Sequence, residues 1–130
     1  MNEFKIGEIS IGLNHRPVVI AEMSGNHNQS LERALVIIEA AAKTGVQMLK
    51  LQTYTADTMT IKSDNQDFKI KEGNWKGKTL YDLYKKAQTP FEWHKELFLY
   101  AKKLELTCFS SVFDESAIDL LENLGCCAYK

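Results

Sequence analysis

The 130-residue sequence has no apolar run near the length of a membrane-spanning helix and no excess of charge of one sign. A spanning helix needs about 20 consecutive apolar residues, and the opening residues MNEFK have no apolar signal core behind them. The 16 Lys and Arg residues nearly balance the 17 Asp and Glu residues, without an acidic or basic block. These absences argue against a membrane protein, a disordered tail and an electrostatic nucleic-acid binder, and we expect a cytoplasmic protein.

Cysteine is scarce and poorly spaced for metals or disulfides. Cys108 stands alone, and Cys126 and Cys127 are neighbours, so the count is odd and no CxxC pair exists. This pattern predicts reduced, buried thiols and argues against a zinc site or a disulfide framework. A glycine-rich phosphate loop is also missing. What is present is 45% hydrophobic residues, enough for the core of one globular domain.

Apolar periodicity predicts strands and helices in alternation. Four strands are expected, over residues 18–21, 46–54, 106–113 and 126–130. The first is so apolar and β-branched that we expect it to be buried on both faces. Helices are expected after Ser30, over 80–87, after Thr89 and after Asp114. Thr89 and Glu92 form a predicted capping box with Pro90 at the first helical position.

The order of these elements predicts an α/β fold with a parallel sheet. Alternating strands and helices form either an open doubly wound sheet or a (β/α)₈ barrel. A hairpin over residues 4–13 precedes them, and residues 55–79 form a polar excursion. The chain ends on a strand, and a whole barrel needs about 250 residues. We therefore expect residues 1–130 to be the first half of a TIM barrel, the N-terminal portion of one catalytic domain.

Polar side chains occur at the end of each predicted strand, where parallel α/β folds collect their reacting groups. They are Glu22, Ser24, Lys50, Gln52, Ser110, Ser111 and Lys130. Two lysines facing one pocket would bind an anion. Each lysine could instead reach solvent or pair with a carboxylate such as Glu22, and the two serines could be small residues that let a barrel close. His27 is expected to be a hydrogen-bonding residue at a helix entry.

Five stretches carry a family resemblance: residues 18–28 (VVIAEMSGNHN), 50–60 (KLQTYTADTMT), 75–84 (WKGKTLYDLY), 108–115 (CFSSVFDE) and 128–130 (AYK). Over essentially its whole length the sequence resembles the N-terminal part of the sialic acid synthase family, and within it the pseudaminic acid synthase branch. The family condenses phosphoenolpyruvate with an amino-sugar aldehyde on a (β/α)₈ barrel and releases phosphate. For this branch the resemblance implies 2,4-diacetamido-2,4,6-trideoxy-altrose as the sugar.

The resemblance also implies roles for five residues. Lys50, Lys130, Ser111 and Asn74 would bind phosphoenolpyruvate, and Glu22 would be the family's N-terminal catalytic glutamate. It implies a divalent metal, Mn²⁺ or Mg²⁺, with ligands outside this chain, and a homodimer of the full-length protein. Without the later residues, the 130-residue chain is expected to be inactive alone.

Two departures from the family pattern and three alternatives remain open. Val112 stands where the family has proline in SSPF, and Cys126 and Cys127 precede AYK in place of an apolar residue and proline. The sugar branch could instead be that of N-acetylneuraminate or legionaminate synthases. An aldolase with a Schiff base on Lys50 or Lys130 would suit the same strand ends. A non-catalytic half barrel that binds an anion or a partner is the third alternative.

Overall fold

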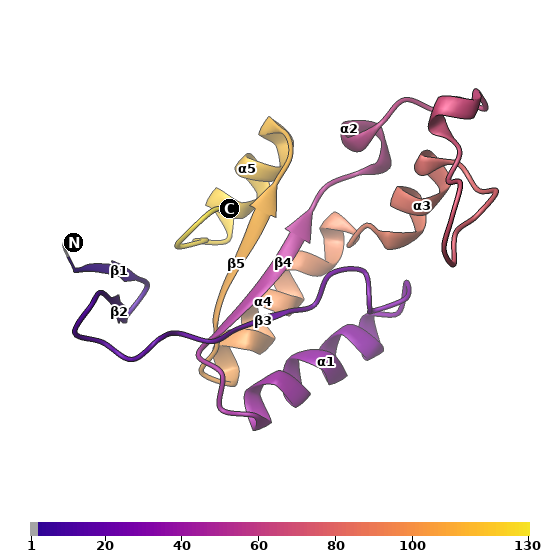
Figure 1. The fold of residues 1–130 in the computed structure, drawn as a ribbon. Coiled ribbons are helices and arrows are strands. Elements are labelled where there is room, and N and C mark those ends of the chain that lie inside the picture. The colour runs from indigo at the N-terminus through magenta and orange to yellow at the C-terminus, as the bar shows by residue number, and fades with distance from the viewer. Residues whose placement is uncertain (1–2) are drawn as a thin grey trace.

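The computed structural model describes residues 3–130 as two small sheets with helices packed around the larger one (Figure 1). The strands are β1 (Phe4–Ile6), β2 (Ile9–Ile11), β3 (Ile20–Glu22), β4 (Met48–Thr53) and β5 (Thr107–Val112). The helices are α1 (Leu31–Lys43), α2 (Ala56–Met59), α3 (Leu80–Ala87), α4 (His94–Lys103) and α5 (Glu115–Asn123), with 3₁₀ turns at Gln66–Phe68 and Phe91–Trp93.

The predicted N-terminal hairpin is confirmed. Strands β1 and β2 pair antiparallel, with Phe4 opposite Ile11. Gly7 turns the chain between them with a φ of +57°, a left-handed conformation that glycine adopts without steric cost. The hairpin lies apart from the main sheet, near the amino ends of its strands (Figure 1).

The main sheet is parallel, in the order β3, β4, β5. Its register places Glu22 opposite Lys50, and Gln52 opposite Ser111. The predicted strand over 126–130 is reduced to one parallel bridge, between Tyr129 and Ser110. The alternation of strand and helix is therefore confirmed, and the fourth strand has only begun where the chain ends.

The expectation that the first strand is buried on both faces was wrong. The strand lies at Ile20–Glu22 rather than 18–21, and the side chains of Val19 and Ile20 are 57% and 43% exposed. The reason is topological: within residues 3–130, β3 pairs only with β4, so it is an edge strand. An edge strand is covered on fewer sides than a central one.

A hydrophobic core lies between the sheet and helices α1 and α4. The Ser30 hydroxyl accepts from the Arg33 amide and caps α1, as predicted. Ile38 of α1 and Leu97 of α4 are fully buried against Leu49 and Leu51 of β4. The apolar faces predicted for the two main helices thus meet on the same face of the sheet.

Helix α4 begins differently from the prediction. A 3₁₀ turn over Phe91–Trp93 precedes it, and no side chain caps either element. The predicted capping box at Thr89 was wrong because the Thr89 side chain is buried and its hydroxyl lies 3.2 Å from Nε2 of His27. A buried side-chain partner has replaced the backbone amide that a cap would bind.

The polar excursion over 55–79 is confirmed as mostly irregular, but it holds one short helix that periodicity missed. Helix α2 begins after Thr55, where the Thr55 backbone amide donates to the Thr58 hydroxyl. The excursion and α3 extend outward beyond the carboxyl end of β4 (Figure 1). Among residues 3–130, none of the helices has the length and apolar character that crossing a membrane requires.

Candidate anion site at the strand ends

The alternation of side chains along β4 and β5 gives the main sheet two different faces. Leu49, Leu51 and Thr53 point toward the helices, and the intervening Lys50 and Gln52 point away from them. We call the first the helix face; it also carries Cys108 and Ser110, by register. We call the second the lysine face. It carries Glu22, Lys50, Gln52, Ser111 and Lys130.

Lys50 and Glu22 form an ion pair on the lysine face. The ammonium Nζ donates to Oε2 of Glu22, which lies directly opposite on β3. The two side chains are 15% and 37% exposed. The carboxylate partner considered for Lys50 is therefore present. An ammonium has three donors, so this contact leaves Lys50 able to bind a further acceptor.

Ser111 is the buried hydroxyl of the lysine face. The residue is 4% exposed, and among residues 3–130 its Oγ has no hydrogen-bond partner. A buried donor without a partner costs roughly 1–3 kcal/mol. A ligand oxygen bound beside Lys50 would remove that cost, so the unpartnered hydroxyl is a mark of a binding site.

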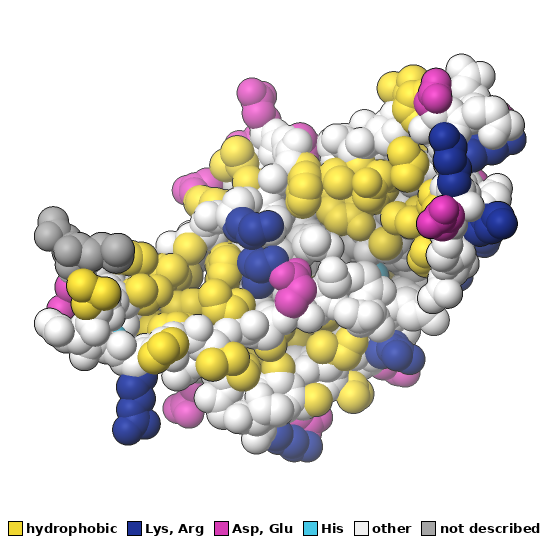
Figure 2. Space-filling view, in the orientation of Figure 1, with side chains coloured by type: hydrophobic (Ala, Val, Ile, Leu, Met, Phe, Trp, Pro, Cys, Tyr) yellow, Lys and Arg dark blue, Asp and Glu magenta, His cyan; other side chains and the backbone are white. Residues whose placement is uncertain are grey.

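Lys130 is held next to Ser111 by its backbone. Its amide donates to the Ser110 carbonyl at 3.1 Å, and its carbonyl accepts from the Val112 amide at 3.3 Å. Since Tyr129 lies opposite Ser110, alternation puts Lys130 opposite Ser111 on the lysine face. Figure 2 shows basic and acidic side chains in contact near the middle of this face, with apolar patches on either side.

The loop between β3 and α1 is strained where it meets the site. Ser24 has a φ of 52°, and Asn28 and Gln29 also have positive φ values. The Ser24 hydroxyl donates to Oε1 of Gln52 at 3.1 Å, which joins this loop to β4. Strained non-glycine residues collect at functional sites, where the surrounding structure must hold them in place.

His27 has the structural role that the sequence predicted. The Gln29 amide donates to its Nδ1 at 3.1 Å, so the proton of the neutral ring lies on Nε2, 3.2 Å from the Thr89 hydroxyl. Burial lowers the pKa of His27. The ring also packs edge-on against Trp93. His27 joins the entry of α1 to the segment before α4.

Asn74 lies in the polar excursion over 55–79. It is exposed, in a turn closed by the Lys76 amide and the Gly73 carbonyl at 3.1 Å. Within the described residues, no hydrogen bond joins its side chain to Lys50, Ser111 or Lys130. The role of Asn74 stays a prediction.

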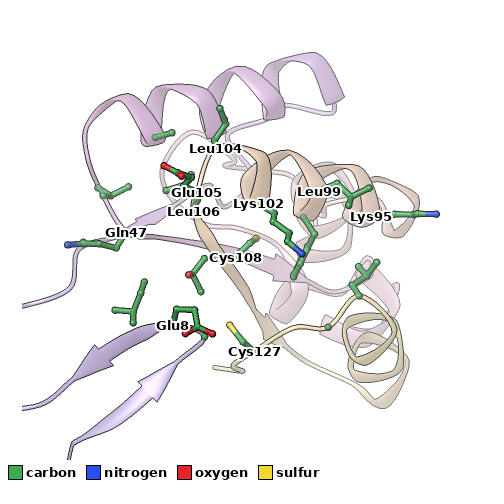
Figure 3. Close-up of a pocket in the computed structure, with 18 of the residues that line it drawn as sticks. Glu8, Gln47, Lys95, Leu99, Lys102, Leu104, Glu105, Leu106, Cys108 and Cys127 are labelled. Carbon is green, nitrogen blue, oxygen red and sulfur yellow. The ribbon is translucent and has the colours of Figure 1, made fainter.

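A cavity of about 1100 Å³ lies at the opposite end of the sheet. It opens between the hairpin, the amino ends of β4 and β5, and helices α4 and α5 (Figure 3). Glu8, Gln47, Leu106, Cys108 and Cys127 are among its lining residues. Burial raises the pKa of the Cys108 thiol, so this sulfur is a poor nucleophile. We therefore place the candidate chemistry at the carboxyl ends of the strands rather than in this cavity.

A divalent metal does not fit the described residues. Across residues 3–130, no three His, Cys, Asp or Glu side chains are grouped so that they could hold an ion. The three cysteines are free thiols, but only Cys108 is buried. The prediction of buried thiols was wrong for Cys126, which is half-buried, and for Cys127, which is exposed.

Comparison with known proteins decides the family. Residues 37–130 match the model described as the NeuB family. The chain belongs to the NeuB family. It is 47% identical over 112 residues to a pseudaminic acid synthase of Campylobacter jejuni and 47% identical over 114 residues to that of Helicobacter pylori, covering 86% and 88% of this chain. An N,N'-diacetyllegionaminic acid synthase of Legionella pneumophila is 34% identical over 82% of this chain.

Solved structures confirm the predicted fold. The N-acetylneuraminic acid (sialic acid) synthetase of Leptospira borgpetersenii, solved with citrate, matches 95% of this chain with a TM-score of 0.77 and 25% identity. The spore coat polysaccharide biosynthesis protein SpsE of Bacillus subtilis matches 98% with a TM-score of 0.72 and 27% identity. This NeuB-family chain is thus the first part of a TIM barrel. It spans 39% and 32% of those two structures and about a third of the curated relatives.

The sequence predicted correctly which strand ends carry the candidate site residues, but not the face of the sheet for each of them. Lys50, Ser111, Lys130 and Glu22 lie together on one face of this NeuB-family fold, as parallel strand ends require. Ser110 was grouped with Ser111 but lies on the helix face, because neighbouring strand residues point to opposite sides.

Two buried polar residues between the sheet and helix α4 were missed. Thr53 and His94 are fully buried and hydrogen-bonded to one another. The sequence held one indication of this pair. Thr53 follows Leu49 and Leu51 on the same side of β4, so a polar residue stands where the pattern predicts an apolar one.

Proposed function

We propose that this chain supplies the phosphoenolpyruvate-binding part of a pseudaminic acid synthase. The full-length protein would condense phosphoenolpyruvate with 2,4-diacetamido-2,4,6-trideoxy-altrose to a nonulosonic acid and phosphate. Its sequence supports this branch, because identity to pseudaminic acid synthases is 46–47%, against 31–34% to N,N'-diacetyllegionaminic acid synthases.

The observation that carries the proposal is the unpartnered Ser111 hydroxyl on the same sheet face as two lysines. Phosphoenolpyruvate has a carboxylate and a phosphate, with nearly three negative charges. Ammonium and hydroxyl donors form strong, charge-assisted hydrogen bonds with such groups. Lys50, Ser111 and Lys130 are the donors that this face offers.

The proposed reaction forms one carbon–carbon bond and exchanges one carbon–oxygen bond for another. The vinyl carbon of phosphoenolpyruvate attacks the aldehyde carbon, whose oxygen takes a proton. Water adds to the resulting cation-like carbon and loses a proton. The carbon–oxygen bond to phosphate then breaks with its electron pair leaving on phosphate, while the proton of the added hydroxyl passes to the phosphate and the carbonyl forms. Lys50 and Lys130 would hold the two anionic groups throughout.

Glu22 is placed for either of two roles. Its carboxylate lies beside the Lys50 ammonium, at the carboxyl end of β3. From there it would accept a proton from the attacking water or stabilise positive charge at the reacting carbon.

The ion pair argues against the Schiff-base alternative at Lys50. Attack on a carbonyl needs the free amine, and the Lys50 ammonium is bound to Glu22. Borohydride would trap a carbonyl substrate on an aldolase lysine, and the condensation proposed here forms no such adduct.

The metal and the dimer belong to the proposal for the full-length protein. A bound Mn²⁺ or Mg²⁺ polarises a carbonyl oxygen as a Lewis acid. Because the described residues do not form a metal site, we propose that its ligands lie beyond Lys130, and each step above uses only side chains of this chain. Asn74 as a phosphoenolpyruvate contact and homodimerisation are further proposals from the resemblance.

The test is phosphate release by the full-length protein with phosphoenolpyruvate, Mn²⁺ and the diacetamido-trideoxy-altrose. We expect release to need the sugar, and Lys50→Ala and Lys130→Ala to lower kcat/KM about a thousandfold, roughly 4 kcal/mol of transition-state stabilisation. Lys103→Ala is the matched control, because Lys103 is an exposed lysine at the end of α4.

The outcomes separate the alternatives. Activity with N-acetylmannosamine and none with the altrose would move the protein to the N-acetylneuraminate branch and leave the anion site intact. No phosphate release with any of these sugars would overturn the synthase proposal and favour the non-catalytic binding module.

A further inference from the structure

Three polar side chains are completely buried behind the lysine face. Oγ1 of Thr53 lies 2.8 Å from Nε2 of His94 and 2.7 Å from Oγ of Ser110, and each of the three residues is 0% exposed. The contacts join β4, α4 and β5 at one point. Burying polar groups costs free energy unless each finds a hydrogen-bond partner. Three apolar side chains would fill this part of the core without that requirement, so packing alone does not explain why these residues are polar.

The hydrogen bonds of the trio run in one direction. Nδ1 of His94 lies 3.1 Å from the Pro90 carbonyl, which can only accept, so the ring proton lies on Nδ1. Burial lowers the pKa of His94 and favours the neutral ring. The lone pair on Nε2 then accepts from the Thr53 hydroxyl. Thr53 in turn accepts from Ser110, so each donor of the trio has one acceptor.

The trio is attached to the backbone that carries the candidate anion ligands. The Ser110 carbonyl accepts the Lys130 amide at 3.1 Å, and Ser110 is the chain neighbour of Ser111. Ser110 thus links Thr53 and His94 to both of these residues.

We propose that His94, Thr53 and Ser110 are positioning residues for phosphoenolpyruvate, because they anchor the helix face of β4 and β5 so that the Ser111 hydroxyl and the Lys130 ammonium point at one ligand. The inference rests on the proposed function. The trio does not touch the ligand. It acts through the peptide unit that joins Ser110 to Ser111, whose carbonyl accepts the Lys130 amide.

The test measures equilibrium binding of phosphoenolpyruvate alone to the full-length protein. Thr53→Val keeps the shape of the side chain and removes the hydroxyl, and we expect it to raise the Kd about tenfold, because small displacements of binding groups have large effects. Thr53→Ser restores the hydroxyl and should return the Kd to near the wild-type value. Ser110→Ala provides a second variant in which His94 keeps its Thr53 partner.

The control is Ile38→Val, which lowers stability from the same core without contacting the trio. Ile38 is fully buried on α1, and we expect its variant to bind phosphoenolpyruvate as the wild type does. Wild-type Kd values in both folded variants, Thr53→Val and Ser110→Ala, would overturn the positioning role and leave the trio as a part of the core. If the wild-type protein does not bind phosphoenolpyruvate, the proposed function itself fails, and that result is distinct from the first.

Discussion

The two faces of β4 and β5 use the same strands for opposite purposes. On the helix face, Leu49 and Leu51 are fully buried, and the polar Thr53 and Ser110 are bonded to one another. On the lysine face, the Ser111 hydroxyl is buried without a partner among the described residues. The helix face stabilises the fold, because its polar groups are hydrogen-bonded within the chain. The lysine face keeps a hydrogen-bond donor available for a ligand, and this lowers the stability of the fold.

The largest expected difference between the two faces is the loss of stability when neighbouring residues of β4 are replaced by alanine. Leu51→Ala should lower the free energy of unfolding by about 3 kcal/mol, because it leaves a cavity in a packed core. Lys50→Ala, one residue away, should lower it by less than about 1 kcal/mol, because its ion pair with Glu22 is partly exposed. Urea denaturation of the full-length variants measures both. Equal losses would contradict the division between the faces.

Local patterns in the sequence were enough to predict the two faces. The alternation of residue types over 46–54 puts Lys50 and Gln52 on one side and Leu49 and Leu51 on the other, and the burial of these four residues in β4 agrees with it. Helix α1 was also predictable, since Ser30 and Gly45 mark its ends. These features depend on residues near one another in the sequence, where propensity and periodicity act.

Features that depend on distant contacts were not predictable. The Thr89 hydroxyl binds His27, which lies 62 residues away, so the local capping pattern failed. Thr53 binds His94 across 41 residues. The exposure of Ile20 follows from which strands pair with β3, and its own apolar character gives no indication of that.

The adjacent Ser110 and Ser111 of β5 allow the same comparison of the two faces with a smaller expected effect on stability. Ser111→Ala removes an unpartnered buried hydroxyl, so the free energy of unfolding should stay constant or rise by up to about 1 kcal/mol. Ser110→Ala removes a bonded hydroxyl and should lower it by about 1 kcal/mol. Ser111→Ala should also weaken phosphoenolpyruvate binding about tenfold, because it removes a direct contact. Urea denaturation and equilibrium binding of the two variants are the measurements, and a stability loss in Ser111→Ala would argue that its hydroxyl is already bonded.

The smallest effect is a dependence of stability on the protonation of two buried histidines, His94 and His27. Burial lowers the pKa of His94 in the folded state below its ordinary value of 6.5, and it does the same for His27. As pH falls below about 6.5, the unfolded state therefore binds protons first, and folding must release them.

Stability should accordingly be constant above about pH 7 and decrease below about 6.5, with both histidines contributing to the loss. Urea midpoints at about pH 8 and pH 5.5 test the expectation. His94→Gln, measured against His27→Gln, assigns the two contributions, since each variant should lose part of the slope. A wild-type protein that is equally stable at both pH values would show that a neutral His94 is not required to hold the buried trio together.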